Sequence, residues 1–102
     1  MARFDVYRNP NPRASHGLLL DLQSDLVRTH TRWCVPLLRA EPATAVMTGA
    51  QLLLTVTAES WLLDTPNILA VPSLLLRAPV VRLTGPDQLQ VESALDFMLR
   101  GW

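Results

Sequence analysis

The pattern of apolar and polar positions predicts short strands over most of the chain and one helix near its end. Residues 4–8 alternate and begin with an aromatic side chain, which is typical of a half-buried strand. Residues 17–22 are apolar on both sides and predict a strand buried on both faces. The other segments with a strand pattern are residues 33–38, 51–57, 61–64, 68–71, 73–77 and 80–83. Short, closely spaced strands followed by one helix indicate an antiparallel α+β domain.

Proline, glycine and small polar residues place the connections between these strands. Residues 9–13 hold two Pro and two Asn residues and predict a stiff loop. Residues 23–32 predict a turn or a short edge strand, and residues 39–49 a connecting stretch. Pro36 is expected at the end of its strand or at a bulge, because proline cannot donate to a strand ladder. Residues 58–60 are expected to form the tight turn of a hairpin.

The longest helical pattern covers residues 87–99 and leaves a tail of residues 100–102. Asp87 and Gln90 have the spacing of a capping box, which would satisfy the first free amides of the helix. Gly101 permits a left-handed stop at the other end. More than one side of this helix is expected to be buried, since its apolar positions recur at three- to four-residue spacing on two edges: Leu89, Val91, Ala94, Leu95, Phe97 and Met98.

Composition and charge narrow the class of protein. One domain is expected for 102 residues. The hydrophobic content of 49% lies at the apolar end of ordinary globular usage, and the Leu and Val content is more than a small monomer hides easily, which predicts a subunit interface. Nine basic and nine acidic residues cancel, unlike the net positive charge of nucleic-acid-binding proteins. The single cysteine excludes an intrachain disulfide and fits a reducing compartment. No apolar run approaches the ~20 residues of a membrane span, and the first residues lack the apolar segment of a signal peptide, so a cytoplasmic protein without membrane contact is expected.

No group of residues has the spacing of a catalytic or metal site, and neither a cofactor nor a metal is expected. The carboxylates of Asp21 and Asp25 suit acid–base chemistry, but four residues apart near a turn they are better explained as solvated or bonded to backbone amides. His16 and His30 lack companion ligands at metal spacing. Three further side chains are expected to lie in the core or in an interface: Trp33, Cys34 and Trp61.

Six landmarks occur in order along the chain. They are Phe4-x-Val6-Tyr7, Asp21-Leu22-Gln23-Ser24-Asp25, Arg32-x-x-Val35-Pro36-Leu37, Glu59-Ser60-Trp61, Ala70-Val71-Pro72, and a terminal helix with a Gly one residue before the last position. No landmark is specific alone, but their order and spacing together resemble the CcdB family of bacterial toxins. The resemblance spans essentially the whole chain, with about one deletion in the turn at residues 29–32.

The resemblance implies a fold, a function and a set of partners. The fold is an SH3-like antiparallel β-barrel with a small side sheet and a C-terminal α-helix, assembled as a homodimer. The function is that of the toxin of a type II toxin–antitoxin module, associated with plasmid maintenance, which binds the DNA gyrase A subunit and traps the cleaved-DNA complex without performing chemistry itself. A disordered segment of a CcdA-like antitoxin would neutralise the toxin, and operator DNA would be contacted only through that antitoxin.

Carried over position by position, the family's gyrase-contacting residues fall on Leu26, Val27, Asp96, Leu99, Arg100, Gly101 and Trp102. The family typically has Asn, Trp, Gly and a final Ile where this chain has Asp96, Arg100, Gly101 and Trp102. Arg100 either complements the helix dipole or has replaced a Trp that stacks on a gyrase arginine, which would bring two cations together. Trp102 is expected to contact a partner, and it can restore the stacking from two positions later.

Two other functions stay open. The MazF and Kid ribonuclease toxins are thought to share this barrel, and an RNA-cleaving site would need a general base and a cation near the phosphorus. Asp25, Arg28, His30 and Arg32 form the only sensible cluster for that chemistry. The second possibility is a relative that keeps the dimer and the antitoxin contact but no longer poisons a target, as the substituted tail suggests.

Overall fold

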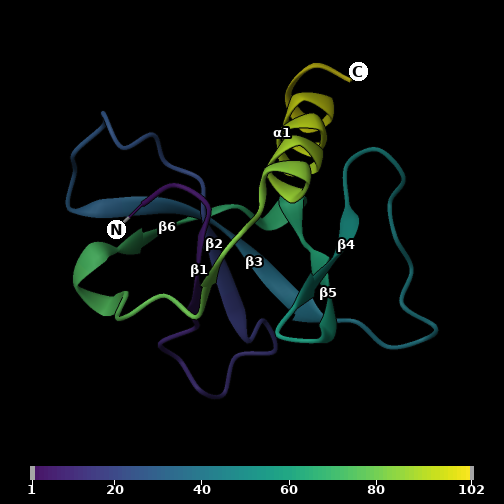
Figure 1. Cartoon of the computed structure of the whole chain (residues 1–102), viewed down its shortest axis with the longest axis horizontal. Coiled ribbons are helices and arrows are strands. Elements are labelled where there is room, and N and C mark those ends of the chain that lie inside the picture. The colour runs from purple at the N-terminus through teal and green to yellow at the C-terminus, as the bar shows by residue number, and fades with distance from the viewer. Residues whose placement is uncertain (1, 102) are drawn as a thin grey trace.

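A curled antiparallel sheet forms the body of the protein, and one helix covers it (Figure 1). The computed structural model describes residues 2–101. The strands follow the order β4-β5-β3-β2-β1-β7 across the sheet, and β6 pairs with β3. The strands are β1 (Asp5–Arg8), β2 (Leu18–Asp21), β3 (Thr31–Arg39), β4 (Leu52–Val56), β5 (Glu59–Leu63), β6 (Leu69–Pro72) and β7 (Val81–Arg82); the helices are α1 (Gly85–Arg100) and the short 3₁₀ turns η1 (Thr65–Asn67) and η2 (Ser73–Leu75).

The central strand β3 has different partners along its two halves. One edge pairs with β2. The other edge pairs with β6 over residues 31–34 and with β5 over residues 37–39. Along this second edge, β6 pairs with the first half of β3 and the β4–β5 hairpin pairs with its second half. The sheet curls into an SH3-like barrel. This architecture confirms the predicted α+β fold class.

The sheet has apolar side chains packed on both faces. Leu18 and Leu20 of β2 lie in the main core beneath α1, whereas Leu19 lies in a smaller core on the opposite face, so the prediction of a doubly buried strand is confirmed. Cys34 is buried in the smaller core, as predicted. Trp61 packs against the main core. Helix α1 contributes its fully buried residues Val91 and Ala94 to the main core.

Helix α1 begins two residues earlier than predicted and has no capping box. Its N-cap is Thr84, whose backbone is extended and whose hydroxyl lies 3.4 Å from the Asp87 carboxylate. Pro86 lies in the first turn, where its missing amide costs no helical hydrogen bond. The predicted pairing of Asp87 with Gln90 is wrong, because both residues already lie inside the helix.

The helix ends at Arg100, which the sequence pattern had placed in the tail. Gly101 follows with a φ of 83° and donates its amide to the Phe97 carbonyl at 2.8 Å. The predicted left-handed stop is therefore confirmed. Because Arg100 lies in the last helical turn, its charge is favourably placed against the helix dipole.

Pro36 lies within β3 and does not end it, contrary to the prediction. Its carbonyl accepts the amide of Asp64 at 3.0 Å, so this edge of Pro36 faces the gap between β6 and β5. A residue's N–H and C=O point to the same edge of a strand. The missing amide of Pro36 therefore falls where no strand pairs, and the ladder loses nothing.

Two further boundaries differ from the predictions. Residues 73–77 do not form a strand, because η2 occupies Ser73–Leu75 and leaves Leu74 95% exposed. The hairpin between β4 and β5 is confirmed, but it turns at Thr57 and Ala58, one residue earlier than expected. Both turn residues have positive φ values, 49° and 67°, as the turns that match the twist of two-residue hairpins require.

Candidate target-binding surface

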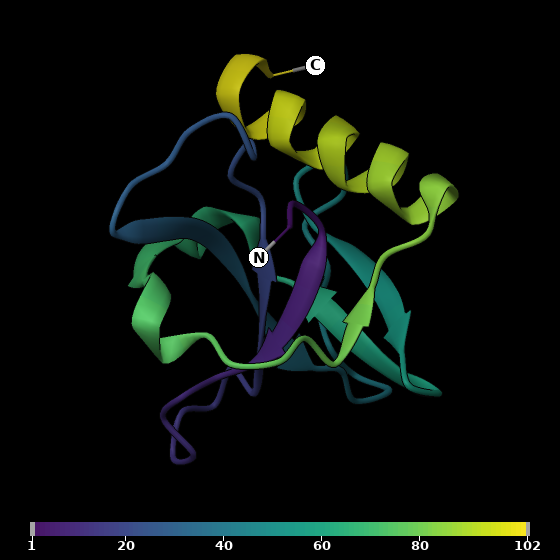
Figure 2. The ribbon, with the colours of Figure 1, turned by 60° about the vertical axis from the view of Figure 1, so that its left-hand side comes forward.

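The two groups of residues expected to contact a target lie at the same end of the molecule. Leu26 and Val27 belong to the loop between β2 and β3, and Asp96 and Leu99 belong to the last turns of α1. Figure 2 shows this loop and the C-terminal end of α1 together at the top of the barrel. Residues more than 60 positions apart in sequence thus border one surface.

The side chains at this surface are unusually exposed for apolar residues. Leu26 is 93% exposed and Leu99 is 82% exposed, while Val27 is half-buried. Asp96, Arg100 and Gly101 are also exposed, and Trp102 lies outside the described residues. Exposed large apolar side chains gathered at one place are typical of an interaction site, whereas scattered ones are not.

Trp33 joins the two groups. One cavity of about 450 Å³ lies between Trp33 and the Val27 loop, and a second cavity of about 300 Å³ lies between Trp33 and the end of α1. The first is lined by Leu22, Gln23, Ser24, Val27, Thr29, Thr31 and Trp33. The second is lined mainly by apolar side chains: Leu22, Trp33, Thr65, Pro66, Ile68, Leu95, Met98 and Leu99.

Trp33, Ile68 and Met98 are members of this surface that the sequence reasoning did not place there. Trp33 is 61% exposed, so it does not lie in the core. Its predicted place in an interface stays a prediction. The alternation along β3 carried a usable signal, since Arg32 and Cys34 on either side of Trp33 face inward. A large aromatic at the outward position of such a strand indicates a contact surface.

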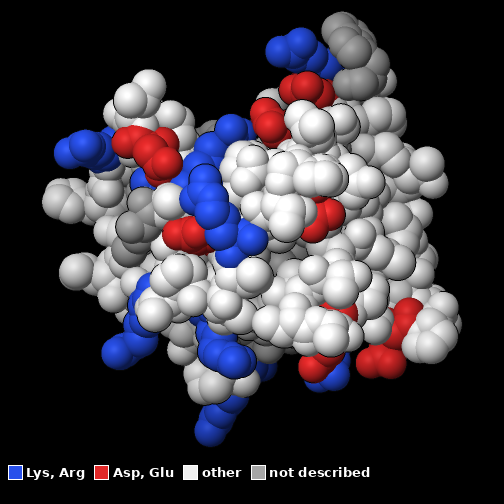
Figure 3. All heavy atoms as spheres, viewed as in Figure 1, with Lys and Arg blue, Asp and Glu red and all other residues white. Residues whose placement is uncertain are grey.

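Charged side chains of both signs occur on the face shown in Figure 3. Basic and acidic side chains are interspersed at its upper left, those at its lower left are basic, and a broad uncharged area lies beside them. This distribution agrees with the formal net charge of zero. An extended cationic surface of the kind that binds nucleic acid is not seen on this face.

Arg32 and Asp25, two members of the cluster considered for RNA cleavage, are engaged in internal bonds. Arg32 is only 7% exposed, and its guanidinium lies 2.9 Å from Asp21 and 3.3 Å from Asp25. Complete burial raises the pKa of Asp21 although Arg32 opposes the shift, whereas the Arg3 amide and Arg32 lower the pKa of Asp25. Arg32 is therefore held by internal partners and has no free face for a phosphate. Arg28 and His30, the other two members of the cluster, are exposed.

The carboxylates of Asp21 and Asp25 serve a structural role, as predicted. Asp21 accepts the Gln23 amide at 3.1 Å, and Asp25 accepts the Arg3 amide at 3.0 Å. Both carboxylates thus bond to backbone amides, one of the two predicted alternatives; Asp25 is also exposed to solvent, whereas Asp21 is completely buried. The reason is the guanidinium of Arg32, which replaces water as the partner of the Asp21 carboxylate.

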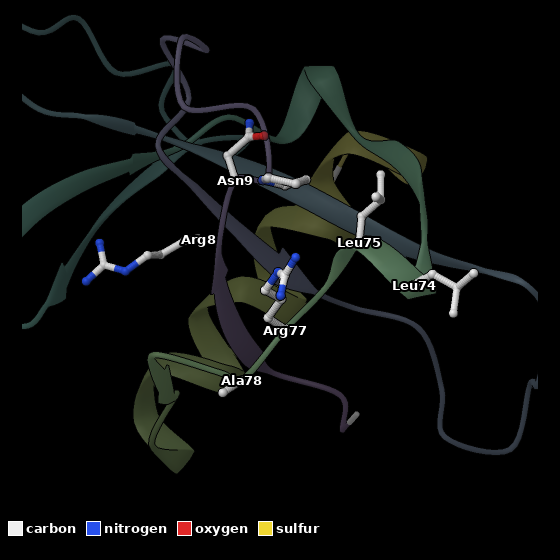
Figure 4. Close-up of a pocket in the computed structure, with 7 residues that line it drawn as sticks. Arg8, Asn9, Leu74, Leu75, Arg77 and Ala78 are labelled. Carbon is white, nitrogen blue, oxygen red and sulfur yellow. The ribbon is translucent and has the colours of Figure 1, made fainter.

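A third cavity, of about 400 Å³, lies away from this surface (Figure 4). Arg77 points toward it, whereas Arg8 extends away. The Asn9 side chain is occupied, because its amide donates to the His16 carbonyl and its oxygen accepts the Asn11 amide. The lining contains no carboxylate or nucleophile: Arg8, Asn9, Pro10, Leu74, Leu75, Arg77 and Ala78.

His16 has a partner, but it belongs to no metal site. Its Nε2 lies 2.8 Å from Oδ2 of Asp64. Asn67 donates to the same oxygen, and Gln51 donates to Oδ1 of this carboxylate. Among residues 2–101, no three His, Cys, Asp or Glu side chains are grouped to hold a metal ion. Within the same residues, no helix is both long and apolar enough to cross a membrane.

These features define a small α+β barrel that displays an apolar contact surface beside the end of its terminal helix. The family model described as CcdB protein matches residues 3–101, nearly the whole chain. The chain therefore belongs to the CcdB family, a family of toxins from toxin–antitoxin modules. No curated protein is similar enough to the chain to count as a match.

Proposed function

We propose that this protein is the toxin of a type II toxin–antitoxin module and that it poisons DNA gyrase by binding. The end of α1 and the loop at residues 22–30 contact the gyrase A subunit and hold the cleaved-DNA complex. The observation that carries this proposal is that Val27 and Leu99 line cavities on either side of Trp33, with the exposed Leu26 next to Val27 in the same loop. Membership of the CcdB family supplies the class of target.

The proposal includes a homodimer. Trp33, Ile68 and Met98 form a partly exposed apolar area between the proposed gyrase contacts, and a second copy of the chain covers it. A two-fold contact at this place brings both helix ends to one composite surface. An antitoxin of the CcdA type neutralises the toxin by covering apolar surface on that dimer, and no enzymatic step is involved.

The test is direct binding of the purified protein to the dimerisation region of the gyrase A subunit. Leu99→Ala and Leu26→Ala are each expected to weaken binding about tenfold or more, because large exposed side chains become buried on binding. Leu74→Ala is the matched control, since Leu74 in η2 is 95% exposed but lines neither of the two cavities beside Trp33. Binding by this control is expected to equal that of the wild type.

A variant that ends at Leu99 tests the tail as a whole. Loss of binding on this truncation would assign the contact to Arg100, Gly101 and Trp102. Absence of binding by the wild type would refute the gyrase proposal and favour a family member that no longer poisons this target. Equal losses in Leu74→Ala and Leu99→Ala would refute the location of the site.

A further inference from the structure

The loop that carries Leu26 and Val27 has a defined shape although it contains no strand or helix. Leu26 projects into solvent, so packing of its own side chain does not hold the loop. The tip is a tight turn in which the Leu26 amide donates to the Ser24 hydroxyl at 3.2 Å and the Val27 amide donates to the Ser24 carbonyl at 3.0 Å. Other hydrogen bonds or contacts must therefore hold the turn in place.

The side chain of Gln23 lies beneath this turn and spans the loop. It is 9% exposed, and its amide nitrogen donates to the Val27 carbonyl at 2.8 Å and to the Thr29 hydroxyl at 3.3 Å. Its amide oxygen accepts the backbone amide of Trp33 at 3.1 Å. One buried side chain thus connects the exposed tip, the far end of the loop and the start of β3.

A second group of bonds fixes the base of the loop. The Arg32 guanidinium donates to the Gln23 carbonyl at 3.1 Å while it remains paired with Asp21. The Arg3 side chain donates to the Leu22 carbonyl at 2.9 Å. The backbone position of Gln23 is therefore held independently, and its side chain can act as a fixed strut.

We infer that Gln23 is a positioning residue, which holds Leu26 and Val27 ready for the target and does not itself contact it. This inference rests on the proposed function for the identity of the target. A loop that is ordered before binding loses less conformational entropy on binding than a mobile loop, and its affinity is correspondingly higher. Replacing the Gln23 side chain should therefore reduce the affinity for the target more than it reduces the stability of the fold.

The test compares Gln23→Ala with Gln51→Ala. Gln51 is a matched control, because its oxygen accepts the Met47 amide at 3.0 Å and its nitrogen donates to Asp64 at 3.0 Å, so it braces a loop elsewhere in the molecule. In Gln23→Ala, amide hydrogen exchange at Leu26 and Val27 is expected to accelerate about tenfold, and the Kd for the gyrase fragment to rise about tenfold. In Gln51→Ala, both quantities should stay at wild-type values even if the melting temperature falls equally.

Gln23→Glu is a second variant for the case that Gln23→Ala does not fold. Its carboxylate keeps the shape and the acceptor for the Trp33 amide but cannot donate to the Val27 carbonyl, so the same two changes are expected. An unchanged Kd in the Gln23 variants, or an equal loss in Gln51→Ala, would overturn the inference.

Failure of the proposed target gives a different result. If the wild type does not bind gyrase, the proposed function fails, and growth arrest on expression becomes the reporter of target engagement. Arrest that is weaker in the Gln23 variants than in Gln51→Ala would keep the positioning role, and equal arrest would overturn it. If the wild type does not arrest growth either, the positioning role fails with the proposed function.

Discussion

The buried ion pair between Asp21 and Arg32 offers a quantitative test of the fold. Asp21 is fully buried and accepts the Arg32 guanidinium at 2.9 Å and the Gln23 amide at 3.1 Å. Asp21→Ala leaves a buried guanidinium with one remaining charged partner, the partly exposed Asp25 at 3.3 Å. Breaking a buried pair on one side costs about 3–5 kcal/mol, because the other charge stays out of water. The remaining Asp25 contact places the expected cost near the lower limit, about 3 kcal/mol.

This cost is a large part of the free energy of unfolding of a domain of this size, which is about 5–15 kcal/mol. At about 4–8 °C per kcal/mol, the melting temperature should fall by about 12–24 °C. The control is Glu59→Ala, which breaks the pair between Arg39 and Glu59. That pair has a shorter separation, 2.6 Å, but its side chains are 62% and 42% exposed, so the expected cost is about 0–1 kcal/mol.

Urea unfolding followed by tryptophan fluorescence measures both free energies. In a double-mutant cycle, Asp21→Ala with Arg32→Ala should cost less than the sum of the two single changes, because the second change removes the stranded charge. A cost for Asp21→Ala no larger than that for Glu59→Ala would refute the reasoning, since burial and not separation is the claimed cause.

Three further outcomes are expected. Val91→Ala should lower the free energy of unfolding by about 2 kcal/mol in urea unfolding, because Val91 is fully buried, and a change below about 0.5 kcal/mol would contradict its place in the core. Gly49→Ala should lower the melting temperature, because Gly49 has a φ of 89° and the added Cβ would lie 2.9 Å from the Phe97 ring, whereas Gly85→Ala, with open space around it, should be tolerated. Burial raises the pKa of the Cys34 thiol to about 12, so at pH 8 a thiol reagent should label the native protein only at the rate of its opening, and fast labelling without urea would show the thiol to be accessible.

Local chemistry allowed several features to be predicted from the sequence. The doubly apolar run at residues 17–22 predicted a strand buried on both faces, and Gly101 predicted the left-handed end of the helix. The turn at Thr57 and Ala58 was predicted one residue too late, because neither Thr nor Ala is a residue type that commonly adopts a positive φ. Pro36 was predicted at a strand end or a bulge, but it lies inside β3, because its position there depends on a gap between two partner strands that come later in the chain.

The α+β class, the succession of strands before a terminal helix and the family pattern could be predicted from the sequence alone, because periodicity, turn residues and motif spacing are local properties of the chain. Which charges are buried and which apolar residues share a surface depends on the three-dimensional packing. Arg32 reads as an available cation in sequence, yet the folded chain encloses it between Asp21 and the backbone of Gln23. Val27 and Leu99 line cavities on either side of Trp33 only because strand pairing and helix packing bring distant segments to one end of the barrel. The local sequence pattern carries no information on such pairings.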